Sequence, residues 1–356
     1  MSTENTFVVV TTIQPPTDCM KTLAGRVRAE GLKWLVVGDR KGPSAYPLPP
    51  AELVSIEQQR RLPFRTARLL PERHYARKNL GYLLAMACGC ECLYETDDDN
   101  APLDTWRPRS REIAGYEIEA HHRCRWVNIY EAFTTEQIWP RGLPLPQARR
   151  HFADNFVIER TPVWKAAPIQ QGLANGSPDV DAVWRLVLDH DVVFDDAPNL
   201  LVPHGVWCPF NSQNTWWWRE VFPLLYLPSH CSFRMTDIWR SFVAQRCLWE
   251  LGHELEFHQA DVHQDRNEHD LMCDFDHETV GYLRNDEFCR ILEACALRAG
   301  PAHLEDNLFR CYEALATAGM IDRAELPLVK AWLEDCQEIN ANAGRESRAV
   351  EPAEFS

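Results

Sequence analysis

The sequence of this 356-residue chain predicts an α/β fold: a mostly parallel, Rossmann-like central sheet flanked by helices, with a helical C-terminal extension. Strand-like and helix-like segments alternate over about the first hundred residues, as in a doubly wound parallel sheet. From Asn285 onward the pattern is helical only. Three consecutive aspartates, Asp97–Asp99, follow one of the expected strands and mark the edge where such sheets bind ligands.

The first predicted strand, Phe7–Ile13, is a continuous β-branched run, which is typical of a buried parallel strand. Thr17 or Asp18 can cap a helix over Cys19–Glu30, because short polar side chains accept hydrogen bonds from a helix N-terminus. The second strand is Trp34–Gly38, and Asp39 directly follows it.

A short strand over Leu53–Ile56 and a helix over Ala76–Ala87 precede the strand Cys90–Tyr94, which leads into the aspartate triplet. Burying three adjacent carboxylates is costly unless a cation neutralises them. Mn²⁺ or Mg²⁺ would do so, because both prefer carboxylate oxygens and keep open positions for phosphate. The triplet therefore suggests metal-bridged diphosphate binding, and a solvated acidic turn is the alternative.

The carboxyl ends of the predicted strands would bring Thr11, Thr12 and Asp39 to the same edge as the triplet. The net charge of −15 argues against nucleic-acid binding, which needs a basic surface. It also means that a phosphate ligand needs local help, from a metal, from Arg77 and Lys78, or from backbone N–H groups.

No apolar run approaches the roughly 18 residues that a membrane-spanning helix needs, so we expect no integral membrane segment. The N-terminus shows no signal peptide, and thirteen cysteines in such a chain suggest reduced thiols and a cytoplasmic location. Cys88, Cys90 and Cys92 form no CxxC pair, so we expect small buried residues rather than a zinc site.

The middle of the chain has a different texture. Proline, tryptophan and arginine punctuate residues 106–146, which predicts a long ordered loop or insertion packed by aromatics. Val183–Asp196 resembles a short helix followed by a strand, and Leu200–Asn214 contains a strand and a polar loop. The triple tryptophan Trp216–Trp218 is expected in the core, with stacking on a sugar or base as the alternative.

Asp237–Leu251 is an amphipathic helix for which Thr236 or Asp237 would be the N-cap. Further helices are predicted over 286–299, 303–318 and 322–338, with Gly300–Pro301 and Gly319 between them, and residues 340–356 are expected to be disordered. Four histidines crowd residues 258–277 without a recognised metal-binding spacing, and one of them could complete a carboxylate-bound metal site; they are His258, His263, His269 and His277.

A series of segments, in order, resembles the STELLO family of glycosyltransferases, which have a GT-A fold. These segments cover about Phe7 to Glu278 and are VVGDRKGP (Val36–Pro43), ARKNLGYLLAM (Ala76–Met86), YETDDDN (Tyr94–Asn100), IWPRGLPL (Ile138–Leu145), GSPDVDAVWRL (Gly176–Leu186), PFNSQNT (Pro209–Thr215), SFRMTDIWRSFVAQRCLWELG (Ser232–Gly252) and HQDRNEHDLMCDFDHE (His263–Glu278). Reversibly glycosylated polypeptides and plant UDP-arabinopyranose mutases are more distantly similar. Plant STELLO proteins carry a transmembrane anchor, for which this sequence shows no segment.

The resemblance implies transfer of a sugar from a nucleoside diphosphate donor, in particular a UDP-sugar, to a glycan or other hydroxyl acceptor. Asp97, Asp98 and Asp99 would hold Mn²⁺ or Mg²⁺ against the donor diphosphate. Asp39 would contact the nucleobase or ribose. The other residues implied in donor binding are Thr11 and Thr12 in the same pocket and Arg77, Lys78 and Asn79 beside the diphosphate.

An inverting transferase also needs a base to deprotonate the acceptor hydroxyl. Asp237, at a helix start, is the first candidate, and Asp179 and Asp181 are its competitors unless they cap the helix that follows. Second-tier contacts to metal or diphosphate would come from His263, Arg266, Asn267 and His269.

The resemblance also implies a division of the chain. A GT-A domain would span 1–284, with a nucleotide-binding half (1–105) and an acceptor and catalytic half (106–284), before a helical region (285–339) and the tail. Two other functions stay open: a UDP-sugar mutase, and a non-catalytic nucleotide-sugar-binding protein. The tryptophans and the helical region could support a homodimer.

Overall fold

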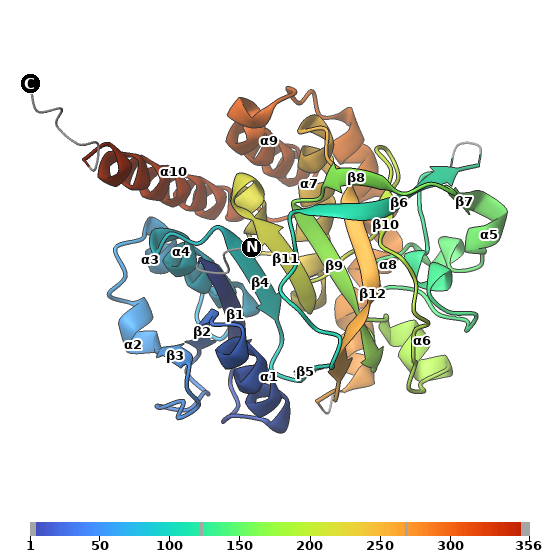
Figure 1. The fold of residues 1–356 in the computed structure, drawn as a ribbon. Coiled ribbons are helices and arrows are strands. Elements are labelled where there is room, and N and C mark those ends of the chain that lie inside the picture. Colours follow the sequence, from blue (N-terminus) through green and yellow to red (C-terminus); the bar gives the residue numbers. More distant parts are fainter. Residues whose placement is uncertain (1–4, 122–123, 268–269, 350–356) are drawn as a thin grey trace, which may run out of the picture.

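The computed structural model describes residues 5–121, 124–267 and 270–349. One sheet runs through the molecule in the strand order β3-β2-β1-β4-β11-β9-β12-β10-β6-β7 (Figure 1). Helices cover both of its faces in the N-terminal half, because Val8 and Val10 of β1 pack with α1 on one face and Val9 packs with α4 on the other. This arrangement confirms the predicted α/β class with its flanking helices.

The N-terminal half is a parallel sheet whose strands and two longer helices lie within about two residues of the predicted ones, whereas its two short helices, 56–59 and 65–69, were not predicted. Thr17 caps α1, since its hydroxyl accepts a hydrogen bond from the Met20 N–H at 3.1 Å. Gly81 lets α4 lie close to the sheet, because a Cβ atom there would come within 2.7 Å of Val9 and Val37. The elements are β1 (Thr6–Thr12), α1 (Asp18–Ala29), β2 (Lys33–Gly38), β3 (Ala51–Val54), α2 (Ile56–Gln59), α3 (Arg65–Leu69), η1 (Tyr75–Arg77), α4 (Lys78–Ala87) and β4 (Cys92–Thr96).

The sheet changes direction after β4. Strand β11 (Asn214–Trp218) runs antiparallel to both β4 and β9 (Ile169–Gly176), whereas β12 (Leu255–Gln264) is parallel to β9. The remaining elements of this half are β5 (Asn100–Pro102), β6 (Glu112–Ala120), η2 (Ile129–Ala132), η3 (Leu145–Gln147), α5 (Phe152–Asn155), β7 (Phe156–Ile158), β8 (Val163–Ala166), α6 (Ala182–Val187), β10 (Leu200–Val202), η4 (Arg219–Leu225) and η5 (Phe233–Met235).

Two expectations for this half need correction. Residues 106–146 contain a regular strand, β6, which pairs with β7, β8 and β10, so only the remainder is the predicted irregular segment. After α6, the chain forms an isolated bridge between Val192 and Gly176 instead of the predicted strand. Trp216 and Trp217 are fully buried, which confirms core packing for them.

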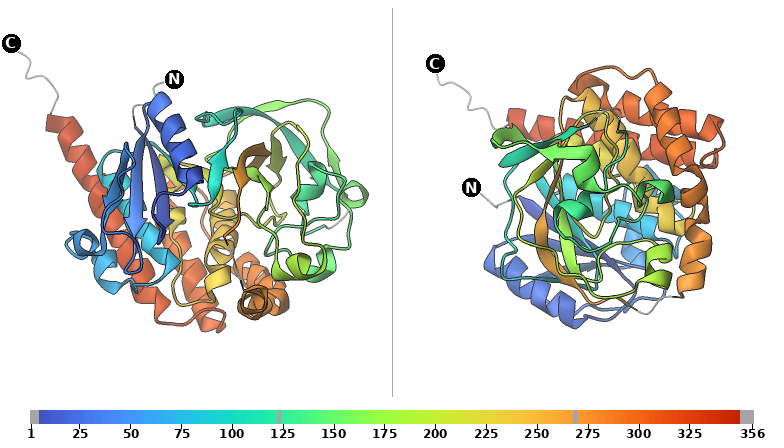
Figure 2. Two further views of the ribbon diagram at one scale, coloured as in Figure 1. Left: turned by 90° about the horizontal axis from the view of Figure 1, so that it is seen from below. Right: turned by 90° about the vertical axis from the view of Figure 1, so that its right-hand side faces the viewer.

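The C-terminal helices are α7 (Thr236–Glu250), α8 (Leu271–Ala294), α9 (Leu304–Thr317, after the short η6, Pro301–His303) and α10 (Glu325–Ala349). Helix α8 begins well before the predicted start at 286, and α10 extends beyond residue 340 into the segment for which disorder was expected; residues 350–356 lie outside the described part. Helix α10 packs against α3, α4 and α9, so the extension lies along the N-terminal half (Figure 2).

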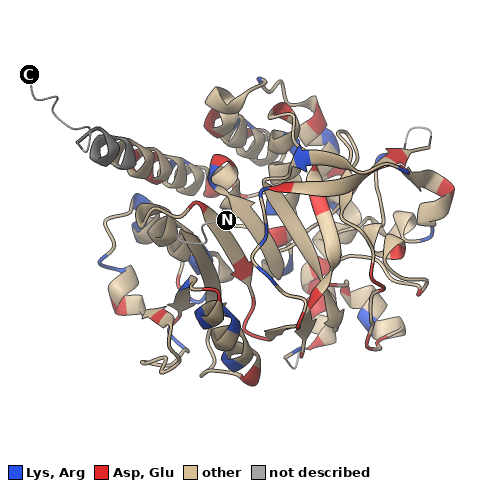
Figure 3. Cartoon of the chain, in the orientation of Figure 1, with Lys and Arg blue, Asp and Glu red and all other residues tan. Residues whose placement is uncertain are grey.

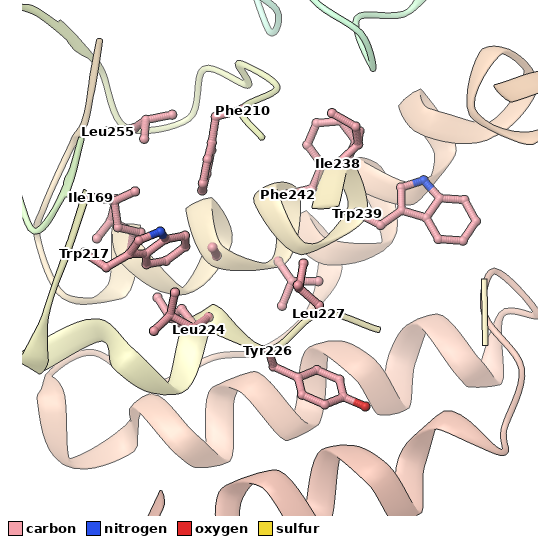
Figure 4. Close-up of a cluster of buried hydrophobic side chains, with 14 of the residues drawn as sticks. Ile169, Phe210, Trp217, Leu224, Tyr226, Leu227, Ile238, Trp239, Phe242 and Leu255 are labelled. Carbon is pink, nitrogen blue, oxygen red and sulfur yellow. The ribbon is translucent and has the colours of Figure 1, made fainter. Parts of the chain in front are cut away.

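The largest core lies between the sheet and these helices. In Figure 4, Trp217 of β11, Tyr226 and Leu227 after η4, and Ile238 and Phe242 of α7 converge on one cluster. Helix α7 is therefore buried on almost every side, which fixes its first turn relative to the strand ends.

The thiols and the hydrophobic segments bear on two further expectations. The thirteen cysteines, all within the described ranges, are free; Cys90 and Cys92 are buried as predicted, whereas Cys88 is exposed. Among the described residues, no helix is both long and apolar enough to cross a membrane.

Candidate functional site

A cavity of about 520 Å³ lies at the carboxyl ends of β1, β2 and β4. It collects most of the polar residues predicted for this edge: Thr11, Thr12, Asp39, Arg77, Asp97, Asp98 and Asp99. The triplet follows β4 directly, where the chain is red beyond the end of that strand in Figure 3. Three parallel strands that end at the same level account for this convergence.

Each aspartate of the triplet has its own polar partner. Lys78 Nζ lies 3.3 Å from Asp97 Oδ1, and the Thr12 hydroxyl donates to Asp98. Gln264 donates to Asp99 Oδ2 at 3.0 Å, but the buried Asp99 Oδ1 has no partner among the described residues.

Burial raises the pKa of all three carboxyl groups. For Asp99 the charges of Asp97 and Asp98 add to this effect, and its pKa reaches about 7. A bound cation would favour the ionised carboxylates instead. The site therefore has the electrostatic character expected of one that is completed by a positively charged group.

The described residues contain no group of three or more His, Cys, Asp or Glu side chains arranged to hold a metal ion. Mg²⁺ is commonly held by one or two carboxylates together with substrate phosphates and water, rather than by a protein cage. The unpartnered Asp99 Oδ1 beside the cavity is a free ligand atom of the right chemistry. The triplet therefore fits an ion that binds together with a phosphate ligand.

The opposite end of the cavity lies over β1 and β2. Asp39 accepts hydrogen bonds from the backbone of Arg40 at 2.6 Å and of His74 at 3.1 Å. Arg77 is held by Gln59 at 2.8 Å, and its Nη2, like Thr11 Oγ1, is buried without a partner in the described residues. Such donors and acceptors would be satisfied by a polar ligand in the cavity.

Two side chains that were predicted to contact the ligand do not line the cavity. Lys78 is fully buried, and its ammonium group also donates to the backbone carbonyls of Thr96 and Ser212, so it ties the end of β4 to the segment before β11. Asn79 forms paired 2.9 Å hydrogen bonds with the backbone of Leu227. Neither side chain lines the cavity.

Arg141 joins two of the candidate base residues. Its Nε and Nη2 bind Asp179 at 2.7 and 2.8 Å, and its Nη1 and Nη2 bind Asp237 at 3.0 and 2.8 Å. The remaining Nη1 donor reaches the Arg234 carbonyl, so all five guanidinium donors are engaged. All three side chains line the cavity.

Against burial, the charge of Arg141 and its hydrogen bonds lower the pKa of Asp237 to about 2. Asp237 lies within the first turn of α7, and Met235 occupies the N-cap position. The prediction that Thr236 or Asp237 caps this helix is therefore wrong. The side chain of Asp237 is instead available to the cavity.

Asp181 does not line the cavity. It is the N-cap of α6, accepting hydrogen bonds from the Trp184 N–H at 2.8 Å and from Trp139 Nε1 at 2.7 Å. Burial raises its pKa to about 7. The helix-cap alternative is confirmed for this residue, and its candidacy as a base is not supported by its position.

The histidine segment contributes little to the cavity. His263 lies 3.2 Å from Asp265 and faces a neighbouring cavity, while His269 lies outside the described residues. Asn267 donates to both Asp98 and Asp99 at 3.5 Å, and Arg266 lines the main cavity.

Several basic and aromatic residues of the cavity were not anticipated from the sequence: Lys41, Arg73, His74, Tyr75, Arg141, Arg185, Phe233 and Arg234. Tyr75 donates to Asp97 at 3.0 Å, and Phe233 packs edge-on against it. The segment Ile138–Leu145, which contains Arg141, is part of the family resemblance. Nothing in its proline-rich pattern distinguishes Arg141 as a cavity residue.

Comparison with known proteins adds independent information. A family model described as STELLO glycosyltransferases matches residues 234–345, from within η5 to within α10. Two Arabidopsis thaliana proteins, named "Probable glycosyltransferase STELLO1" and "Probable glycosyltransferase STELLO2", are 30% and 29% identical over 92% of this chain. The chain spans 44% of the length of each relative.

Proposed function

The chain belongs to the STELLO family of glycosyltransferases, and from this premise we propose that it transfers a sugar from a nucleoside diphosphate donor to a hydroxyl acceptor. The observation that carries the proposal is the aspartate triplet, which opens into a cavity large enough for a small ligand and leaves Asp99 Oδ1 without a partner in the described chain. The donor we propose is a UDP-sugar, with the nucleoside over Thr11 and Asp39.

The triplet would bind Mn²⁺ or Mg²⁺ through Asp97 and Asp99, and Asp98 is oriented by Thr12. When bound, the ion would offset the negative charge that develops on the leaving nucleoside diphosphate. Lys78 supports this arrangement by holding Asp97 and the carbonyl of Thr96 in place.

We assign Asp237 as the group that receives the acceptor proton. In the transfer, the bond between the anomeric carbon and the donor phosphate oxygen breaks, and its electron pair leaves with the nucleoside diphosphate. The acceptor hydroxyl oxygen bonds to the anomeric carbon, and its proton passes to Asp237.

The low pKa of Asp237 makes it a weak base. It suits proton transfer that follows bond formation, because an acceptor oxygen already bonded to the anomeric carbon is far more acidic than the free alcohol. Arg141 would then hold Asp237 ionised and correctly oriented, and Asp179 would position Arg141.

The proposal is tested by calorimetric titration with nucleoside diphosphates and their sugars, with Mn²⁺ and with EDTA. We expect one nucleotide to bind with metal, and Asp97→Asn/Asp99→Asn to weaken that binding about tenfold or more. The exposed Asp306 of α9 provides the control, since Asp306→Asn removes a carboxylate from a helix that contributes no residue to the cavity.

Absence of binding to every nucleotide by the folded protein would overturn the proposal. Where a nucleotide sugar does bind, analysis of the products formed from donor alone separates sugar transfer from the related activities. Sugar rearrangement without acceptor would indicate a mutase, whereas metal-dependent binding without any turnover would indicate a binding protein.

A further inference from the structure

Three arginines from separate segments gather at one end of the cavity. Arg185 belongs to α6, Arg234 to η5, and Arg266 follows β12, and all three line the main cavity. Burial is the main cause of the lowered pKa of Arg185 and of Arg266. The charge of Arg234 lowers the pKa of Arg266 further, and the charges of Arg234 and Arg266 lower the pKa of Arg185 further. Two of the guanidinium groups share a carboxylate neighbour, because Asp274 lies 3.8 Å from Arg234 and 2.9 Å from Arg266.

The carboxylates that hold two of these arginines come from α8. Glu278 binds Arg234 at 2.8 Å, and Asp274 binds Arg266 at 2.9 Å. Both acids are buried, and Glu278 also accepts hydrogen bonds from the Ala182 backbone and the Tyr282 hydroxyl. These contacts orient the two arginines.

Arg185 differs from the other two. Its side chain is only 5% exposed, and its carboxylate neighbour is Asp189, which is itself largely exposed and lies 3.7 Å away. One Nη atom donates to the Pro178 carbonyl at 2.6 Å, but the buried Nε has no partner among the described residues. A buried cation with an unsatisfied donor beside a cavity is suited to bind an anion.

Arg185 and Arg266 also line a second cavity, which adjoins the first and extends away from Thr11 and Asp39. Its other walls carry polar groups that suit sugar hydroxyls: Ser177, Asp189, His190, Asp191 and His263. An anionic group between the two arginines can therefore belong to a molecule that occupies the second cavity while the main cavity holds a nucleotide.

We infer that Arg185, with Arg234 and Arg266, forms a binding site for an anionic group, a phosphate or a carboxylate, on the acceptor sugar. The inference rests on the proposed function and deepens it, because it assigns the acceptor to the class of acidic or phosphorylated sugars. The donor diphosphate remains with the aspartate triplet.

The test is calorimetric titration of the protein, saturated with nucleoside diphosphate and Mn²⁺, with a hexose 6-phosphate, a hexuronate and the neutral hexose. We expect at least one charged sugar to bind about tenfold or more tightly than the neutral hexose, and Arg185→Gln to remove that preference. The phosphate and carboxylate titrations identify which group the site prefers.

Arg266→Gln is the second variant and should also remove the preference for the charged sugar. It provides the test if Arg185→Gln does not fold. Arg290→Gln is the control, because this largely exposed arginine on α8 lies outside both cavities. Nucleoside diphosphate affinity should stay within about threefold of wild type in Arg185→Gln and in Arg290→Gln.

Equal affinity for charged and neutral hexose would overturn the inference. So would a loss of nucleoside diphosphate affinity in Arg185→Gln as large as the loss for the charged sugar, because the arginines would then serve the donor. The sugar titrations are repeated without nucleotide to keep the two proposals apart. Failure of nucleotide binding counts against the proposed function, whereas the preference for charged over neutral sugars decides this inference.

Discussion

Arg240 and Arg141 both bind carboxylates away from solvent, but their surroundings differ. Arg240 of α7 forms a two-pronged pair with Glu95 of β4 at 2.7 and 3.0 Å, and Glu95 also accepts hydrogen bonds from Trp217 and Tyr82. Neither member of this pair touches the cavity. Arg141 instead divides its donors between Asp179 and Asp237, which both line the cavity.

The difference concerns what remains available on the carboxylates once each arginine has bound them. Glu95 is enclosed and its oxygens are fully used, so the Arg240 pair can only hold β4 and α7 together. The Arg141 group carries one cation for two carboxylates and borders space that a ligand can enter. The enclosed pair therefore supports the site, and the open group can take part in its chemistry.

The largest expected effect breaks the open group. Asp237→Asn should lower turnover about 10²–10⁴-fold, the usual range for loss of a group that accepts a proton. Initial rates at saturating donor measure the effect. Asp181→Asn is the control: asparagine can still cap α6 but loses the acceptor for Trp139, so stability should fall while the rate stays within about threefold of wild type. Equal losses in the two variants would contradict the assignment of Asp237.

The next effect breaks the enclosed pair. Arg240→Met leaves the Glu95 charge buried without a cation, and we expect the free energy of unfolding to fall by about 3–5 kcal/mol. Urea unfolding followed by fluorescence measures the change. Arg240→Met/Glu95→Gln should recover most of it, because glutamine removes the charge, its Oε1 can accept from Trp217 and its Nε2 can donate to the Tyr82 oxygen. A single variant as stable as wild type would show that the pair is dispensable.

The smallest effect sharpens the comparison through pH. The pKa of Asp237 is lowered to about 2 in the folded chain, below its ordinary value of about 3.9 in the unfolded chain. Its stabilising contribution is thus present above about pH 4 and is lost as the pH falls toward 2. The difference in unfolding free energy between wild type and Arg141→Met should shrink over this range, by about 1–3 kcal/mol.

Asp181 should behave in the opposite way. Its folded pKa of about 7 lies above the unfolded value, so its contribution is present below about pH 4 and is lost as the pH rises toward 7. Asp181→Asn should remove that part of the pH dependence. Urea unfolding of the variants between pH 2 and 8 tests both signs, and a difference that is independent of pH would contradict both.

The sequence allows one side of the cavity to be predicted well. Runs of β-branched residues mark β1 and β2, and the carboxyl ends of parallel strands share one edge of a sheet. Thr11, Asp39 and the aspartate triplet were therefore expected to meet, and they line one cavity. Local pattern is sufficient here because each residue directly follows, or ends, a strand.

The other side could not be predicted in this way. Arg141 and Arg234 lie in irregular or short segments without periodicity, and long-range packing carries them to the cavity. Lys78 and Asn79 show a second difficulty. They open a helix that is buried on nearly all sides, so closeness to a motif in the sequence does not determine which way a side chain faces.

The packing of α10 on α3 affects the order in which the chain can fold. Helix α3 has no side-chain cap of its own, and Asp335 of α10 accepts hydrogen bonds from the N–H groups of Arg65 and Thr66 at 2.9 and 2.8 Å. The contact spans 270 residues, so a ribosome adding about 5–20 residues per second supplies the cap roughly 15–50 s after α3 is made. Throughout that interval the first N–H groups of α3 lack the acceptor that Asp335 supplies.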